Sequence, residues 1–235
     1  MPDLMAYLGI HTATTHTALT LLTDQGFFTE TFLRRSAETD NLILTIDHLC
    51  QRAAVDFRRL LGIVVTTGPG HYLGIRVGST TVSMLHAALQ IPTYGISTLD
   101  ALLPATAQGL YWVLLPARKG SWHASLFRVI WQPEAHVQIS ENSALLGQGW
   151  GYTALTAPFV IKEESLSQTL HRFHAPITVC GEISTLPQIL ENEKTPVRYL
   201  DTRVDTARLA SLAKQRHLAG MPGEGLRPYY GYDAV

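Results

Sequence analysis

The segment TTGPGHYLGIRVGSTTVSMLHAAL, residues 66–89, restricts the fold more than any other part of the chain. The apolar run Leu61–Val65 before it predicts a strand, and a helix is expected from about Arg76. The loop between them is held by Gly68, Pro69, Gly70 and Gly74. Glycine permits positive φ and close backbone approach, whereas proline fixes φ, so this loop should be rigid and should set the position of the helix.

Two interpretations of the glycine loop are open from the sequence. Backbone N–H groups at such a loop and at a helix start can bind a phosphate, or they can bond to the backbone of a neighbouring segment. The spacing G-P-G-H-Y-L-G is one residue too long for the dinucleotide fingerprint, and the chain contains no Gly-Lys-Ser or Gly-Lys-Thr of a Walker loop. A tight turn without a ligand therefore remains as good an interpretation as a binding loop.

Charged residues are scarce in this chain. Of its 235 residues, 46% are hydrophobic and 16% are charged. The hydrophobic fraction can fill the core of one large or two small domains, and the scarcity of charge suggests that some surface is reserved for a partner. The formal net charge of −1 argues against unaided binding of nucleic acid.

The cysteines and the start of the chain bear on its location. Cys50 and Cys180 lie far apart without a C-x-x-C, which indicates neither a disulfide framework nor a thiolate metal site. The start MPDLMAYLGI lacks the basic region and long apolar run of a signal peptide, and no stretch is long enough for a transmembrane helix. We therefore expect a cytoplasmic protein with no membrane partner.

Hydrophobic periodicity predicts alternating strands and helices in the first half of the chain. Three strands at 7–11, 17–23 and 27–33 are expected to form an antiparallel meander. A helix capped by Thr39 or Asp40 should follow, with apolar residues at Leu42, Ile43, Ile46, Leu49 and Ala53. After the glycine loop and its helix, a short strand at 94–96 precedes a capping-box-like Ser97-Thr98-Leu99-Asp100.

The pattern begins again in the second half. The expected elements are strands at 111–115, 121–131, 137–139, 177–180 and 197–200 and helices at 162–174 and 206–218. Residues 147–158 should be irregular, and the Gly- and Pro-rich tail should be extended. The two halves thus repeat one theme of hairpin strands followed by helix and strand.

Four segments of the chain resemble the TsaB (YeaZ) family: AYLGIHTATTHTALTLL, TTGPGHYLGIRVG, IPTYGISTLDAL and LRPYYGYDA. The second is similar to the family's GPGSFTGLRIG and is the most specific. The resemblance implies an α/β fold of the actin, Hsp70 and sugar-kinase superfamily, in which two lobes each hold a mixed β-sheet flanked by helices. We expect lobes at 1–107 and 108–204, with the C-terminal helix 205–218 joined to the first lobe, and an extended tail at 219–235.

The resemblance also implies a function. Family members are non-catalytic subunits of the complex that makes threonylcarbamoyladenosine in tRNA. The expected partners are the threonylcarbamoyltransferase TsaD, which modifies the adenosine next to the anticodon, and the ATPase TsaE. Alone the chain would form a homodimer, and tRNA would bind only through the complex. Catalytic residues, cofactors and metals are not expected in this chain.

Two positions depart from the nucleotide-using members of the superfamily. His11 stands where those relatives carry an acid that holds a metal-bound water, and Pro116 stands where a second acid is expected. Imidazole is a poor ligand for magnesium, which prefers carboxylate oxygen. A nucleotide-binding ATPase or kinase is therefore an alternative that both residues oppose.

No arrangement of residues in the sequence indicates catalysis. TsaD carries a metal-binding histidine pair at i, i+4, and no two of the ten histidines here lie four apart. His171 and His174 are three apart but have no nearby carboxylate or cysteine, and Asp100 at a helix start is expected to be a cap. The chain has no G-x-S-x-G or H-E-x-x-H, so a glycopeptidase-like hydrolase is an alternative without an evident nucleophile.

The helix after the glycine loop is the strongest functional signal. Residues 77–99 contain no Asp, Glu, Lys or Arg, so this helix should be buried on more than one side. A sheet and the preceding helix can cover part of it. The resemblance implies that the rest joins TsaD, or a second copy, in a four-helix interface; the alternative is the core of a monomer. The expected interface residues are Leu42, Ile46, Leu49, Arg76, Ser79, Ser83 and Ala87.

Overall fold

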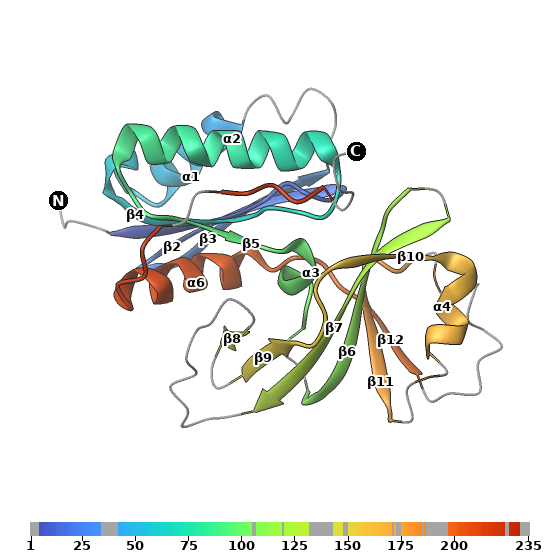
Figure 1. The fold of residues 1–235 in the computed structure, drawn as a ribbon. Helices are drawn as coiled ribbons and strands as arrows, with labels where there is room; N and C mark the ends of the chain where they lie inside the picture. Colours follow the sequence, from blue (N-terminus) through green and yellow to red (C-terminus); the bar gives the residue numbers. More distant parts are fainter. Residues whose placement is uncertain are drawn as a thin grey trace. The chain divides into compact units, whose positions relative to one another are not determined.

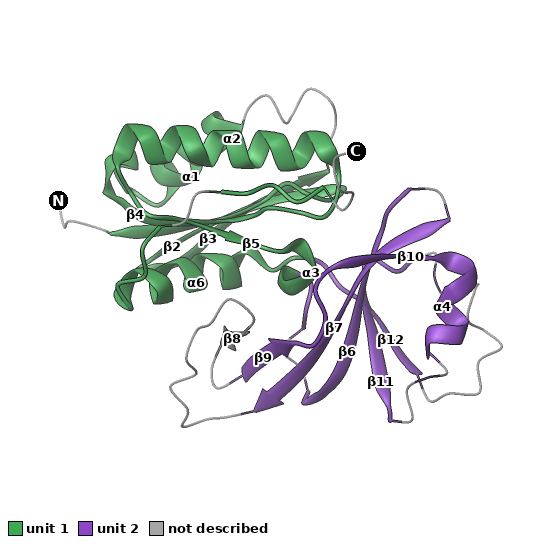
Figure 2. Cartoon of the chain, viewed as in Figure 1, with its two compact units in different colours: residues 1–101, 204–235 green, residues 102–203 purple. Residues whose placement is uncertain are grey.

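The computed structural model divides into two compact units, which Figure 2 distinguishes by colour. Unit 1 comprises residues 1–101 and 204–235, and unit 2 comprises residues 102–203. The structure describes residues 5–33, 42–104, 107–118, 120–131, 143–147, 150–170, 172, 175–184, 186, 197–223 and 226–230, with only the backbone of 143–147. The expected cap at Thr39 or Asp40 and the expected strand at 137–139 lie outside these residues.

Unit 1 is built on a five-stranded sheet in the order β3-β2-β1-β4-β5. The strands are β1 (Ala6–His11), β2 (His16–Thr23), β3 (Gly26–Leu33), β4 (Leu60–Thr66) and β5 (Thr93–Ile96). The first three form the predicted antiparallel meander, and β4 and β5 run parallel to β1. Parallel neighbours require crossover connections, and helices supply them here.

Helices cover both faces of this sheet (Figure 1). α1 (Leu42–Arg52) and α2 (Tyr72–Leu89) close one hydrophobic cluster with the sheet, and α6 (Thr206–Leu218) closes a second cluster on the other face. The short helices η2 (Phe57–Arg59) and α3 (Thr98–Ala101) lie in connections. Within the described residues, no helix is long and apolar enough to cross a membrane.

The start of α2 differs from the prediction. We expected the helix from about Arg76, but it begins at Tyr72, so Gly74 lies inside the helix and not in the loop. Glycine is a poor residue for a helix interior, which is why the sequence favoured a later start. The capping-box-like spacing falls at the start of α3, where the Oγ of Ser97 accepts the N–H of Leu99 at 3.2 Å and Asp100 lies in the first turn.

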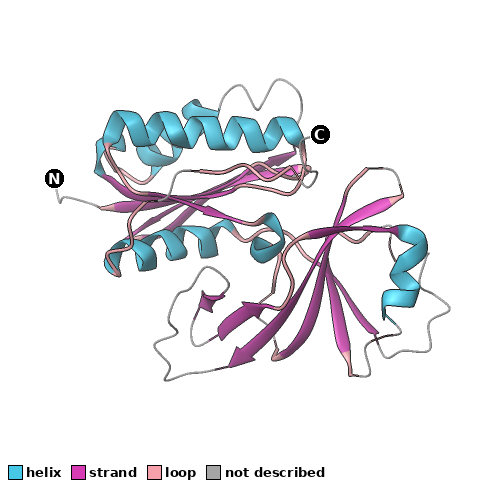
Figure 3. Cartoon of the chain, viewed as in Figure 1, coloured by secondary structure: helices cyan, strands magenta, loops and turns pink. Residues whose placement is uncertain are grey.

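Unit 2 contains a second mixed sheet, with β10 paired to β7 beside the order β12-β11-β6-β7-β9-β8. The elements, shown by type in Figure 3, are β6 (Gly109–Pro116), β7 (Ser121–Trp131), β8 (Ser143–Gly147), β9 (Trp150–Ala154), β10 (Phe159–Lys162), α4 (Glu163–Leu170), β11 (Ile177–Gly181) and β12 (Val197–Asp201). β6 and β7 pair as the predicted hairpin, and β11 lies parallel to β6 and to β12.

The prediction of an irregular segment at 147–158 is wrong for residues 150–154, whereas residues 155–158 form neither strand nor helix. β9 lies within it and pairs with both β7 and β8. Five residues are too few to give a clear period of two, and the neighbouring glycines were a stronger local signal. Helix α4 is also shorter than the predicted 162–174.

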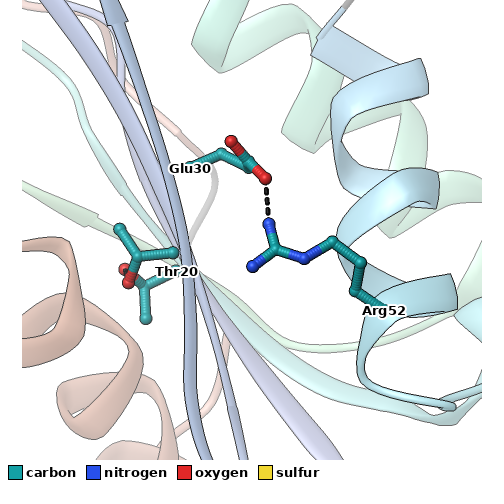
Figure 4. A network of polar contacts seen from close by, with 4 residues as sticks. Thr20, Glu30 and Arg52 are labelled. Atoms are coloured by element: carbon teal, nitrogen blue, oxygen red, sulfur yellow. Dashed lines mark hydrogen bonds and ion pairs between the residues drawn. The ribbon is translucent and has the colours of Figure 1, made fainter.

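Polar contacts join β3 and β2 to both helical layers, and Figure 4 shows Thr20 and the ion pair of Glu30 with Arg52. The buried Oγ1 of Thr20 lies 2.8 Å from that of Thr29 and 2.7 Å from that of Thr206 at the start of α6. On the other face, Glu30 forms an ion pair with Arg52 of α1. That pair is partly exposed, so it contributes at most about 1 kcal/mol to stability.

The contact of β1 with α6 generates a stability prediction. A Cβ added to Gly9 would lie 2.4 Å from the carbonyl oxygen of Thr206 and 2.7 Å from the backbone nitrogen of Ala210. Because these are backbone atoms, Gly9→Ala should lower the free energy of unfolding by about 2 kcal/mol or more. Urea denaturation measures this change.

Gly62→Ala is the matched control for this experiment. A Cβ on Gly62 of β4 would have its nearest neighbours at 3.6 Å, an ordinary van der Waals distance. We expect this variant to change stability by less than about 1 kcal/mol. Equal losses in the two variants would contradict the close packing of α6 on β1.

Candidate functional site

The glycine loop bonds to the backbone of neighbouring segments. The N–H of His71 donates to the carbonyl of Ala13 at 2.7 Å, and the carbonyl of Gly68 accepts the N–H of Thr98 at 2.8 Å. Of the two interpretations left open by the sequence, these contacts match a turn that is held by its neighbours. The loop therefore fixes where α2 starts.

Close contacts explain two glycines of this motif. Gly70 has a φ of +150°, and a Cβ there would lie 2.1 Å from the carbonyl oxygen of Ala13. A Cβ on Gly78 would lie 2.4 Å from the Oγ1 of Thr12, whose hydroxyl donates to the carbonyl of Gly74 at 2.7 Å. Side chains at 70 and 78 would push α2 away from the turn between β1 and β2.

His11 is buried at the end of β1 and bonds to two hydroxyl groups. Its Nδ1 lies 2.9 Å from the Oγ1 of Thr66, and its Nε2 lies 3.0 Å from the Oγ1 of Thr14. Burial, with a smaller effect of His16, lowers the pKa of His11 to about 3, so the ring is neutral at physiological pH. With both ring nitrogens in hydrogen bonds, His11 ties β1 to β4 and is not arranged as a metal ligand.

The other residues considered for chemistry are not gathered into a site. Pro116 ends β6 and is exposed. His171 and His174 lie outside the described residues. In the part of the chain that the structure describes, no three His, Cys, Asp or Glu side chains are grouped so as to hold a metal ion.

Four of the seven expected interface residues are buried inside unit 1. Leu42, Ile46 and Leu49 of α1 are 3%, 0% and 0% exposed and belong to the core cluster, and Ser79 of α2 is 5% exposed. They have almost no surface for a partner, so this expectation is wrong for them. Helical periodicity finds the buried face of a helix, and this face packs within the chain's own unit.

The other three, Arg76, Ser83 and Ala87, lie on the exposed side of α2. Large apolar side chains are also exposed on these helices: Met84 of α2 is 61% exposed, and Leu44 of the neighbouring α1 is 64% exposed. We define the outer face as the exposed residues Ile43, Leu44, Tyr72, Leu73, Arg76, Ser83, Met84 and Ala87. Exposed apolar groups on two neighbouring helices are typical of a protein contact surface.

Sequence reasoning missed five members of the outer face: Ile43, Leu44, Tyr72, Leu73 and Met84. A signal exists in the sequence for Leu44, Leu73 and Met84, because they are large apolar residues out of phase with the buried period of their helices, whereas Ile43 was assigned to that period. The sequence prediction did not distinguish these exposed apolar residues from the neighbouring buried ones.

The environment of His11 generates a prediction about pH. Its pKa falls from about 6.5 in the unfolded chain to about 3 in the fold, so the unfolded chain binds more protons as the pH drops below 6.5. Stability should be complete above that pH and decrease toward pH 3. Replacing the ring by His11→Asn removes the titration, so wild type should lose about 2 kcal/mol more than the variant between pH 7 and pH 5.

Urea denaturation of both proteins at the two pH values measures this difference. The buried His123, whose pKa burial lowers to about 4, contributes to both proteins and cancels. Parallel pH profiles for wild type and variant would show that His11 is not a buried neutral ring.

Comparison with known proteins finds sequence similarity over about half of the chain. A family model described as TsaD, tRNA N6-adenosine threonylcarbamoyltransferase, matches residues 33–132. The tRNA threonylcarbamoyladenosine biosynthesis protein TsaB of Bacillus subtilis is 28% identical over 130 residues, which cover 53% of this chain and 56% of the relative. The match thus spans about half the length of that relative.

Two solved structures have the same fold over nearly the whole chain. An uncharacterized protein with similarity to peptidase YEAZ from Pseudomonas aeruginosa has a TM-score of 0.72 at 18% identity, covering 97% of this chain and 99% of that chain. YeaZ from Pseudomonas aeruginosa has a TM-score of 0.71 at 17% identity with the same coverage. These likenesses and the two mixed sheets flanked by helices confirm the predicted α/β fold with two mixed sheets. The chain is thus similar in sequence to TsaB over about half of its length and has the fold of YeaZ over nearly all of it.

Proposed function

We propose that the chain is a non-catalytic subunit of the system that makes threonylcarbamoyladenosine in tRNA, and that its outer face binds the transferase TsaD. The observation that carries the proposal is the exposed apolar surface of α1 and α2. Arg76 is the one charged residue within the span of α2, so little desolvation of charge opposes docking.

The match to the TsaD family model supports the choice of partner. It covers residues 33–132, which include both α1 and α2. Two related chains with similar surfaces can form a heterodimer in which those surfaces meet about a pseudo-twofold axis. Two copies of one chain form a homodimer in the same way. The same face would then form a homodimer of this chain when TsaD is absent.

The chemistry of the buried nucleophiles supports a non-catalytic role. Cys50 and Cys180 are both buried, and burial raises the pKa of the Cys50 thiol to about 11 and that of Cys180 further. Both thiols are therefore protonated and unreactive at neutral pH. His11, the residue at the superfamily's acid position, is a neutral ring held by two threonines.

Binding of the reactants would then be carried out by other subunits. TsaD would hold the threonylcarbamoyl adenylate and the metal, and TsaE would be a further partner. A chain with a formal charge of −1 has little electrostatic attraction for the tRNA backbone, so tRNA would be bound through the complex.

Reconstitution of the transfer reaction tests this role. TsaD and TsaE from the same cell are mixed with adenylate-generating components and unmodified tRNA, with and without this chain, and threonylcarbamoyladenosine is measured. We expect product formation to depend on the chain and the chain alone to be inactive. Peptide cleavage by the isolated chain would favour the hydrolase alternative, and thermal stabilisation by ATP and magnesium would favour the nucleotide-binding alternative.

Charge on the outer face should prevent docking. Ser83 and Ala87 are exposed on α2, so Ser83→Glu and Ala87→Glu should leave the fold intact. In the complex, each would bury an unpaired carboxylate, and we expect the affinity for TsaD to fall by roughly a hundredfold or more. Isothermal titration calorimetry measures this loss.

Gln25→Glu is the control, because Gln25 is exposed in the turn between β2 and β3 and the variant adds the same charge to the same unit. Its affinity should match wild type. Wild-type affinity in both α2 variants would show that the outer face is not the docking surface.

A further inference from the structure

The C-terminal segment 226–230 is bound to unit 1 beside the glycine loop. The N–H of Tyr229 donates to the carbonyl of Thr67 at 2.8 Å, and Leu226 packs against the core cluster formed by the sheet with α1 and α2. In Figure 1 this red segment leads to the end of α2 where the helix begins. The segment is therefore a docked part of the unit.

Gly68 permits this approach. Its φ is +110°, and a Cβ there would lie 2.0 Å from the carbonyl oxygen of Tyr229. From another direction, the N–H of Thr67 donates to the carbonyl of Ile96 at 2.9 Å, and the N–H of Thr98 donates to Gly68 at 2.8 Å. The turn before α2 is thus held both by the end of β5 and by the C-terminal segment.

The contact continues onto the outer face through aromatic rings. The ring of Tyr230 lies 4.9 Å from that of Tyr72, the first residue of α2, measured between centroids. The guanidinium of Arg76 donates to the Oη of Tyr72 at 3.1 Å and lies 5.4 Å from its ring centroid. Tyr230 therefore contacts Tyr72, a residue of the outer face that is itself bonded to Arg76.

The first turn of α2 needs support from outside the helix. The first N–H groups of any helix have no partner within it, and side chains at the N-cap often supply one. At the N-cap of α2, His71 makes no such side-chain bond, and its backbone N–H bonds to Ala13 instead. Tertiary contacts therefore decide how firmly this turn is held.

We propose that residues 226–230 act as a strap that fixes the glycine loop and the first turn of α2 and so positions Tyr72 and Arg76 for docking. The identity of the docking partner rests on the proposed function. The fixing of the turn, in contrast, is a property of the free chain and can be measured without TsaD.

Two pairs of variants separate the contacts of the strap. Tyr229→Pro removes the N–H that bonds to Thr67, and Tyr229→Ala removes the same ring but keeps that N–H. Tyr230→Ala removes the ring that contacts Tyr72, and Tyr230→Phe keeps it. Both substituted positions are in an exposed or half-buried segment, so the core should remain as in wild type.

Hydrogen exchange of the free chain, followed by mass spectrometry, measures how well the amides of the turn before α2 are protected. We expect exchange in peptides covering residues 66–76 to be roughly tenfold faster in Tyr229→Pro than in Tyr229→Ala, with α6 unchanged as the internal reference. Equal exchange in the two variants would overturn the strap, whatever the result with TsaD.

The affinity of each variant for TsaD tests whether the strap positions the outer face for docking. We expect Tyr229→Pro and Tyr230→Ala to bind roughly tenfold more weakly than wild type, and Tyr229→Ala and Tyr230→Phe to bind within about threefold of it. Faster exchange with unchanged affinity would overturn the positioning role. If wild type itself failed to bind TsaD while exchange responded as expected, the proposed function would be wrong and the fixing of the turn would be supported.

Discussion

The contact between the turn after β1 and the start of α2 determines the arrangement of unit 1. Thr12 donates to the carbonyl of Gly74 from a position that a side chain at Gly78 would fill, and the backbone of Ala13 meets Gly70 and His71. These contacts bring a helix close to the ends of two parallel strands. They also account for the spacing of the glycines, which reflects the approach of neighbouring backbone.

A helix held this closely on its inner side leaves a defined set of residues on its outer side. α2 uses glycine, small and β-branched residues where it meets β4 and the β1 turn, and Tyr72, Leu73 and Met84 project away from them. The binding of a partner to this surface would depend on where α2 begins. The glycine loop contacts both the β1 turn and the C-terminal segment around the start of α2. The position of the outer-face residues on α2 therefore depends on these contacts.

Much of the fold follows from periodicity in the sequence, and the failures have physical causes. The meander, β4 and α6 follow from apolar alternation, from a buried run and from helical periodicity, and the structure adds Asp205 as the N-cap of α6. The start of α2 was placed too late because helix propensity penalises Gly74, which lies inside the helix. Leu42, Ile46 and Leu49 were expected at an interface because a helical stripe does not say whether it packs on its own sheet or on another chain. β9 was missed because five residues give no clear period of two and the neighbouring glycines were a stronger local signal.

The mass in solution, measured by light scattering after gel filtration, tests the central claim that the outer face is a docking surface. The chain is measured alone and mixed with TsaD from the same cell. The account predicts a homodimer for the chain alone and a one-to-one complex in the mixture, because both would use the same face. A monomer in both samples would contradict it, and the exposed apolar residues of α1 and α2 would then need another explanation.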